Sequence, residues 1–211
     1  NFHAVTLGSS FDFYHENRLL GHINLNVPGE YNARNAAGAA AIAARIGIVW
    51  EDIASSLGSY KSMDRRFELT SLQGDILLVD DYAHHPSEIS SALSAARNTR
   101  RRIVAIFQPH LYSRTKEFLE PFSIELMNAD YVVITEIYSA REDFVPDVSG
   151  ALIVDAMRRK GFDNVCFVEN LEEIIPHVKT IVDPGDLVIT MGAGDIWKVS
   201  KEFIDTIGET V

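Results

Sequence analysis

Residues 76–86 read ILLVDDYAHHP: four apolar residues, then two acids, a tyrosine, an alanine and two histidines before a proline. A short apolar run bounded by polar residues is typical of a buried strand. In open α/β sheets, ligands bind beyond the carboxyl ends of the strands. We therefore predict that residues 80–86 form one wall of a ligand site at a sheet edge.

Apolar strands and helices alternate in the chain that follows residue 66. The patterns predict strands at 67–72, 76–79, 103–107, 131–135, 165–168 and 187–191, and helices near 87–98, 115–128, 149–160, 170–180 and 195–207. Continuous apolar strands separated by helices predict a doubly wound, mostly parallel sheet. Gln73-Gly74-Asp75 between the first two strands is a hairpin signal, so we expect one antiparallel edge strand.

The first 66 residues follow another pattern. Residues 1–27 alternate like β-strands, with a turn at Glu16-Asn17-Arg18, and an alanine-rich helix is predicted over 30–46. A second helix is predicted to end at Gly58. We place a domain boundary near Arg66, which gives domains 1–66 and 67–211.

Composition excludes several classes of protein. The 211 residues are 46% hydrophobic, enough for a core, and the net charge of −11 disfavours nucleic acid or an anionic membrane as a partner. Cys166 is the single cysteine, so no intrachain disulfide forms, and a reducing cytoplasmic location is expected. No apolar stretch approaches the ~20 residues of a membrane span. The sequence does not determine the oligomeric state.

Polar residues follow four of the predicted strands. The loops are DDYAHH at 80–85, QPHLYSR at 108–114, EIYSAR at 136–141 and GAGD at 192–195. Parallel strands place such loops at one edge of the sheet. His110 and Arg114 suit a carboxylate, because guanidinium offers a fork that matches two oxygens.

Each feature also has a structural explanation. Asp81 or Ser87 could cap the next helix, the 192–194 turn could be a tight turn rather than an anion cradle, and Arg114 could form a surface ion pair. A metal site at the acids and histidines is a third interpretation, although no H-E-x-x-H spacing supports it.

Taken together, the motifs resemble the Mur ligases. The similar segments are GEYNARNAA at 29–37, RRFE at 65–68, DYAHHP at 81–86, FQPHLYSRT at 107–115 and GAGDI at 192–196. They cover most of the chain in order. The resemblance is strongest to the members that join L-alanine to UDP-N-acetylmuramate with ATP and Mg²⁺, through an acyl phosphate, in peptidoglycan precursor synthesis.

The resemblance also implies roles for individual residues. Asn32 and Asn35 would face the adenine, Arg66 and Asp81 the phosphates and ribose of ATP, and His84 the transferred phosphate. Tyr82, His110 and Arg114 would hold L-alanine and the substrate carboxylate, with Gly192, Gly194 and Asp195 lining the same cleft. The resemblance thus predicts His84, His110 and Arg114 as the catalytic residues.

The chain departs from the family pattern in several places. Tyr31 replaces a usual histidine, and Leu111 a frequent second arginine. No phosphate loop of the G-x-x-G-K-[ST] type occurs, and Mg²⁺ ligands are expected mainly outside these residues. We therefore expect a carboxy-terminal fragment, inactive alone.

The expected fold class is α/β. A Rossmann-like, mostly parallel sheet with one antiparallel edge strand would follow the tail of an ATP-binding central domain, a β-hairpin plus helices. The alternative function is a non-catalytic nucleotide-binding or regulatory module with a flavodoxin-like sheet.

Overall fold

The computed structural model describes residues 2–5, 8–61 and 63–208. The chain divides into two compact units, Asn1–Met63 and Asp64–Val211. The second unit therefore begins just before the two arginines of the 65–68 motif. That the first unit is the tail of a central domain stays a prediction.

The first unit is a three-stranded antiparallel sheet with two helices. Strands β1 (Phe2–Val5), β2 (Gly8–His15) and β3 (Arg18–Leu25) are joined in that order, and helices α1 (Glu30–Arg45) and α2 (Trp50–Gly58) follow. Glu16 and Asn17 have φ of 49° and 62°, as a two-residue hairpin turn requires. The predicted turn and both helices are confirmed.

The second unit is a six-stranded sheet of order β4-β5-β9-β6-β7-β8. Its strands are β4 (Glu68–Leu72), β5 (Ile76–Asp81), β6 (Ile103–Phe107), β7 (Tyr131–Thr135), β8 (Val165–Val168) and β9 (Leu187–Met191). All neighbours are parallel except β4 and β5. The mostly parallel sheet and its antiparallel edge strand are confirmed. A 3₁₀ turn, η1 (Gln73–Asp75), joins β4 to β5, with Gly74 at φ 77°.

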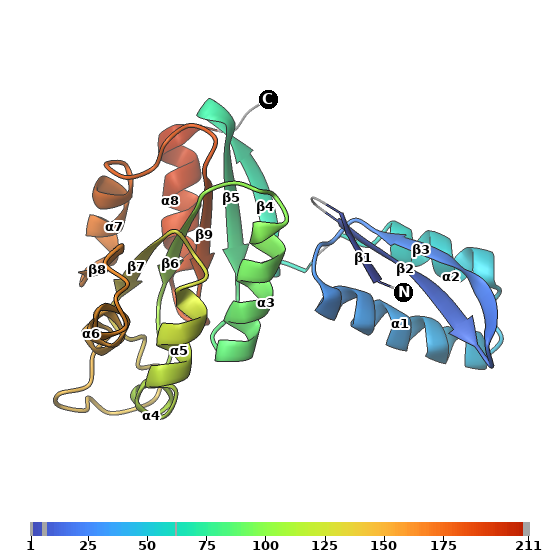
Figure 1. The fold of residues 1–211 in the computed structure, drawn as a ribbon, viewed down its shortest axis with the longest axis horizontal. Helices are drawn as coiled ribbons and strands as arrows, with labels where there is room; N and C mark the ends of the chain where they lie inside the picture. The colour runs from blue at the N-terminus through green and yellow to red at the C-terminus, as the bar shows by residue number, and fades with distance from the viewer. Residues whose placement is uncertain (1, 6–7, 62, 209–211) are drawn as a thin grey trace. The chain divides into compact units, whose positions relative to one another are not determined.

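Helices cover both faces of this sheet (Figure 1). Helices α3 (Pro86–Arg97), α5 (Leu119–Leu126) and α6 (Ala151–Arg159) pack on one face around Phe122 and Leu93. Helices α7 (Leu171–Val178) and α8 (Trp197–Ile207) pack on the other around Ile174 and Phe203. Each helix buries one apolar stripe, so the sheet is doubly wound.

Two boundaries differ from the sequence prediction. Strand β5 continues to Asp81 rather than ending at Val79, because Asp80 pairs with Glu68 and Asp81 with Met191. The predicted helix at 115–128 is two helices, α4 (Tyr112–Glu117) and α5, which meet at Phe118. Pro121 has no N–H to donate to the carbonyl of Glu117, so one continuous helix is disfavoured there.

The polar residues of the sheet edge are thus presented by a tightly packed scaffold. Among the described residues, no helix has both the length and the apolar character that crossing a bilayer demands.

Replacing Phe122 with alanine tests the packing of the α5 face. The Phe122 side chain is fully buried and its ring lies 5.3 Å from that of Phe107. We expect Phe122→Ala to lower the free energy of unfolding by about 3–5 kcal/mol, measured by urea denaturation. Ile124→Ala on the same helix is the control, because Ile124 is 53% exposed. Equal effects of the two substitutions would contradict the assigned core.

Candidate functional site

Backbone hydrogen bonds join the carboxyl ends of three neighbouring strands. The Gly192 N–H donates to the carbonyl of Asp81 at 3.2 Å, and the Gln108 N–H donates to the carbonyl of Met191 at 3.0 Å. A further bond runs from the Tyr138 N–H to the carbonyl of Pro109 at 2.9 Å. All four predicted loops therefore meet at one edge of the second unit.

Asp81 is a buried carboxylate that bonds the backbone before β4 to the loop after β5. Its Oδ2 accepts from the Phe67 N–H at 2.9 Å and its Oδ1 from the Ala83 N–H at 2.8 Å. Burial raises the pKa of Asp81 to about 6, against the opposing effect of these two backbone donors and of Arg66. The helix cap of α3 is His85 and not Asp81 or Ser87.

Asp80 forms an ion pair that extends to the glycine turn. Arg65 Nε lies 3.0 Å from Asp80 Oδ2, and the same guanidinium donates to the carbonyls of Gly192 at 2.6 Å and Gly194 at 3.3 Å. Thr190 donates to the other Asp80 oxygen at 2.8 Å. The largely buried side chain of Arg65 therefore links β5, through Asp80, to the turn that follows β9.

Two arginines flank the ring of Tyr82. The guanidinium carbon of Arg65 lies 5.2 Å from the ring centroid and that of Arg66 lies 5.7 Å away. Cations at these distances are attracted by the ring quadrupole. Two guanidinium groups therefore lie next to Tyr82, and that of Arg65 is already paired with Asp80.

Gln108 shapes the turn at 192–195. Its amide oxygen accepts from the Ile196 N–H at 3.1 Å, and its amide nitrogen donates to Asp195 at 2.8 Å. A Cβ at Gly194 would lie 2.4 Å from the Gln108 oxygen and 2.5 Å from the Tyr138 ring, so only glycine fits. Burial would raise the pKa of Asp195, but the bonds from Gln108 and Lys198 outweigh it and lower that pKa.

Three rings form a row along the edge. The His84 ring lies 5.8 Å from the His110 ring, which stacks on Tyr138 at 5.8 Å with an interplanar angle of 16°. His84 Nδ1 lies 2.8 Å from the carbonyl of Tyr82, which only accepts hydrogen bonds. His84 therefore carries a proton on Nδ1, and in the neutral ring Nε2 is left as an acceptor.

His110 and Arg114 each bury a nitrogen that lacks a partner. Among the described residues, His110 Nδ1 and Arg114 Nη1 have no solvent exposure and no hydrogen bond. Burial lowers the pKa of His110, with further lowering by Arg114 and His84, so its neutral form is favoured. Buried polar atoms are usually paired, so these two are strong candidates for ligand contacts.

The structure places nine of the eleven predicted site residues on this edge or next to it. They are Arg66, Asp81, Tyr82, His84, His110, Arg114, Gly192, Gly194 and Asp195, the last in the bend that precedes α8. The two predicted adenine contacts, Asn32 and Asn35, belong to α1 of the first unit. The Asn32 amide donates to the carbonyl of Pro28 at 2.7 Å, and Asn35 is exposed.

Sequence reasoning missed residues that hold the site rather than face it. Arg65, Gln108, Tyr138 and Glu142 stood inside quoted motifs or next to them, but their partners are far away along the chain. The sequence did contain one signal. In the RRFE and QPH motifs only Arg66 and His110 were predicted to contact ligands, which left Arg65 and Gln108 without a predicted role.

The polar side chains at this edge of the sheet, and not a deep pocket, identify it as the candidate site. Two hollows lie elsewhere: one of about 540 Å³ beside η1, and one of about 630 Å³ in the first unit between Phe13 and Ile42. Within the described ranges, no group of three or more His, Cys, Asp or Glu side chains is arranged to hold a metal ion.

Titration of Asp81 tests the electrostatics of this edge. The carboxyl ¹³C resonance of Asp81 should titrate near pH 6, and that of Asp195 in the same spectra below the ordinary value of 3.8. Since the folded pKa of Asp81 is the higher one, the folded state binds more protons between pH 4 and 6. This group alone then lowers the free energy of unfolding as pH rises, by up to about 3 kcal/mol. Titration of Asp81 near 3.8 would refute its burial.

Comparison with known proteins supplies the family. Residues 65–194 match the model of the Mur ligase, glutamate ligase domain. Two curated relatives are each named UDP-N-acetylmuramate–L-alanine ligase. The protein of Syntrophomonas wolfei is 41% identical over 100% of this chain, and that of Salinibacter ruber is 39% identical over 93%.

A solved structure has the same fold. The chain is similar to UDP-N-acetylmuramate-alanine ligase MurC of Thermotoga maritima, with a TM-score of 0.81 and 27% identity over 97% of this chain and 44% of that one. The chain spans 46% and 42% of the two curated relatives, less than half of each. The family model covers more than half of the residues, and the chain therefore belongs to the Mur ligase family.

Proposed function

We propose that the protein containing this chain is an ATP-dependent ligase that joins L-alanine to UDP-N-acetylmuramate. Family membership and the two relatives of that name at about 40% identity support the reaction class and the substrates. The second unit would supply the wall that binds the amino acid.

The observation that carries the proposal is the pair of buried, unpaired nitrogens of His110 and Arg114. A guanidinium N–H without a partner in a partly buried position is best satisfied by an anionic acceptor, and a carboxylate offers several lone pairs. None of the ion pairs found among the described residues includes Arg114, so its charge is available to a ligand. A carboxylate is common to L-alanine and to the lactyl group of UDP-N-acetylmuramate.

The remaining residues have roles that follow from their positions. Tyr82, next to both arginines, would line the amino-acid side, and Gly192 and Gly194 would let a ligand approach the backbone. The His84 ring lies beside that of His110, and His84 would face the transferred phosphate. Arg66 and Asp81 would face the nucleotide, and Asn32 and Asn35 its adenine.

ATP and Mg²⁺ are the cofactors of the proposed reaction. ATP supplies the phosphoryl group that activates the carboxylate, and Mg²⁺ neutralises phosphate charge. The guanidinium groups of Arg65 and Arg66 next to Tyr82 would support the binding of nucleotide phosphates. The described residues offer no cluster of metal ligands, so the Mg²⁺ ligands would come from phosphates and other parts of the protein.

Release of ADP by the complete protein tests the reaction. We expect release only when UDP-N-acetylmuramate and L-alanine are both present, with L-alanine preferred to D-glutamate. The 211 residues alone should release none, because they contain no phosphate loop. Preference for D-glutamate would refute the substrate, and ligand binding without turnover by the complete protein would favour the regulatory module.

Replacement of Arg114 tests the amino-acid wall. Arg114→Ala should raise the KM for L-alanine or lower kcat, with a loss of at least about tenfold in kcat/KM, because a charge-assisted bond to a carboxylate is removed. Lys116→Ala is the control, since Lys116 is an exposed cation on the same helix. Wild-type kinetics in Arg114→Ala would remove that residue from the site.

A further inference from the structure

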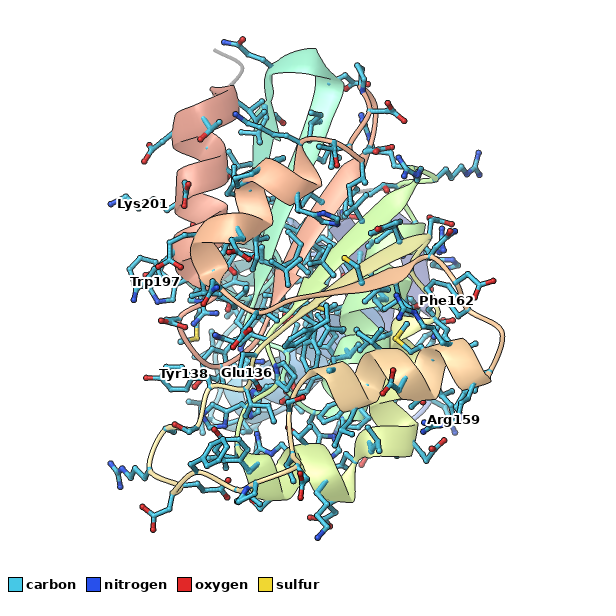
Figure 2. All side chains as sticks on the ribbon, turned by 90° about the vertical axis from the view of Figure 1, so that its left-hand side faces the viewer. Glu136, Tyr138, Arg159, Phe162, Trp197 and Lys201 are labelled. Atoms are coloured by element: carbon cyan, nitrogen blue, oxygen red, sulfur yellow. The ribbon has the colours of Figure 1, made fainter. Side chains whose placement is uncertain are left out.

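A second segment supports the residues that carry the unpaired nitrogens. The 138–142 segment follows β7 and runs beside the turn at 109–113, and its first residue, Tyr138, is marked in Figure 2. The Tyr138 N–H donates to the carbonyl of Pro109 at 2.9 Å, and the Leu111 N–H donates to the carbonyl of Tyr138 at 3.0 Å. These bonds and the stacked rings fix the position of His110.

The turn between His110 and Arg114 has a strained backbone. Leu111 has φ 71° and ψ 135°, a region that side chains other than glycine rarely adopt. Its carbonyl accepts from the Thr115 N–H at 3.0 Å and from the Thr115 hydroxyl at 2.8 Å. Such a conformation persists only where surrounding contacts hold it on both sides.

Glu142 holds the turn at Ser113, two residues after Leu111. Its Oε2 accepts from the Ser113 N–H at 3.0 Å, and its Oε1 accepts a short hydrogen bond from the Ser113 hydroxyl. These bonds from Ser113 lower the pKa of Glu142, so the carboxylate is ionised at neutral pH. Ser113 directly precedes Arg114, so Glu142 acts one residue away from the unpaired guanidinium.

We propose that Glu142 is a positioning residue for the amino-acid site. Its two-point hold on Ser113 stabilises the strained Leu111 conformation and so keeps His110 Nδ1 and Arg114 Nη1 aimed at one carboxylate. Glu142 does not touch the ligand in this scheme. The identity of the ligand rests on the proposed function, whereas the hydrogen bonds of Glu142 to Ser113 do not depend on it.

Without Glu142, the turn is free to return to a relaxed backbone. The Ser113 N–H loses its acceptor, and rotation at Leu111 moves His110 and Arg114 apart. Glutamine preserves the hold, because its amide oxygen accepts from the Ser113 N–H while its NH₂ donates to the hydroxyl. Alanine offers neither. If Glu142 acts by positioning, the glutamine variant should therefore behave like the wild type and the alanine variant should not. If only its charge mattered, both variants should lose activity equally.

Kinetics of the complete protein test the proposal. Glu142→Ala should raise the KM for L-alanine about tenfold, the scale of one lost charge-assisted bond, and leave the KM for ATP unchanged. Glu142→Gln should stay within about threefold of the wild type. Glu117→Ala on α4 is the control, because Glu117 is an exposed acid that is not among the predicted site residues.

Hydrogen exchange gives a readout that does not depend on the reaction. The Thr115 amide, bonded to Leu111, should exchange faster in Glu142→Ala than in Glu142→Gln or Glu117→Ala. An unchanged KM for L-alanine together with unchanged exchange would overturn the proposal, as would equal losses in the alanine and glutamine variants. If the wild type does not use L-alanine, the proposed function fails, and faster exchange at Thr115 still supports the positioning role.

Discussion

The parallel pairing of β5, β9 and β6 is the constraint on which the candidate site depends. Asp81, Met191 and Phe107 lie opposite one another in register across these strands. The chain beyond that row has no further strand to pair with, so three loops must begin side by side. Residues that are more than a hundred positions apart in sequence, such as Arg65 and Gly192, are brought into hydrogen-bonding distance by this pairing.

Polar groups at this row divide into two classes. Asp80, Asp81 and Gln108 are buried, and each is fully engaged with a backbone or side-chain partner. Such networks offset the cost of burying polar atoms and make the edge rigid. His110 and Arg114 instead leave buried nitrogens unpaired. A site that lowers stability in this way gains the ability to bind a ligand that supplies the missing acceptor.

Much of this arrangement was predictable from local patterns. Apolar runs located all six strands of the larger sheet, and the QGD turn indicated the antiparallel edge. The polar ends of the strands indicated where the loops would meet. These predictions succeed because strand burial and turn chemistry are properties of short segments.

The features that escaped prediction depend on contacts between distant residues or on backbone geometry. No local signal shows that Arg65 binds the glycine turn or that Glu142 holds Ser113. The positive φ of Leu111 could not be inferred, because leucine gives no sign of it. The sequence also presented Asp80 and Asp81 as a loop, whereas sheet pairing makes them the end of β5.

The most direct test of the account is a crystal structure of the complete protein with L-alanine and a non-hydrolysable ATP analogue. The account predicts a carboxylate oxygen within hydrogen-bonding distance of Arg114 Nη1, beside His110 and Tyr82. Density for L-alanine at another place, with Arg114 Nη1 and His110 Nδ1 still unpaired, would contradict it.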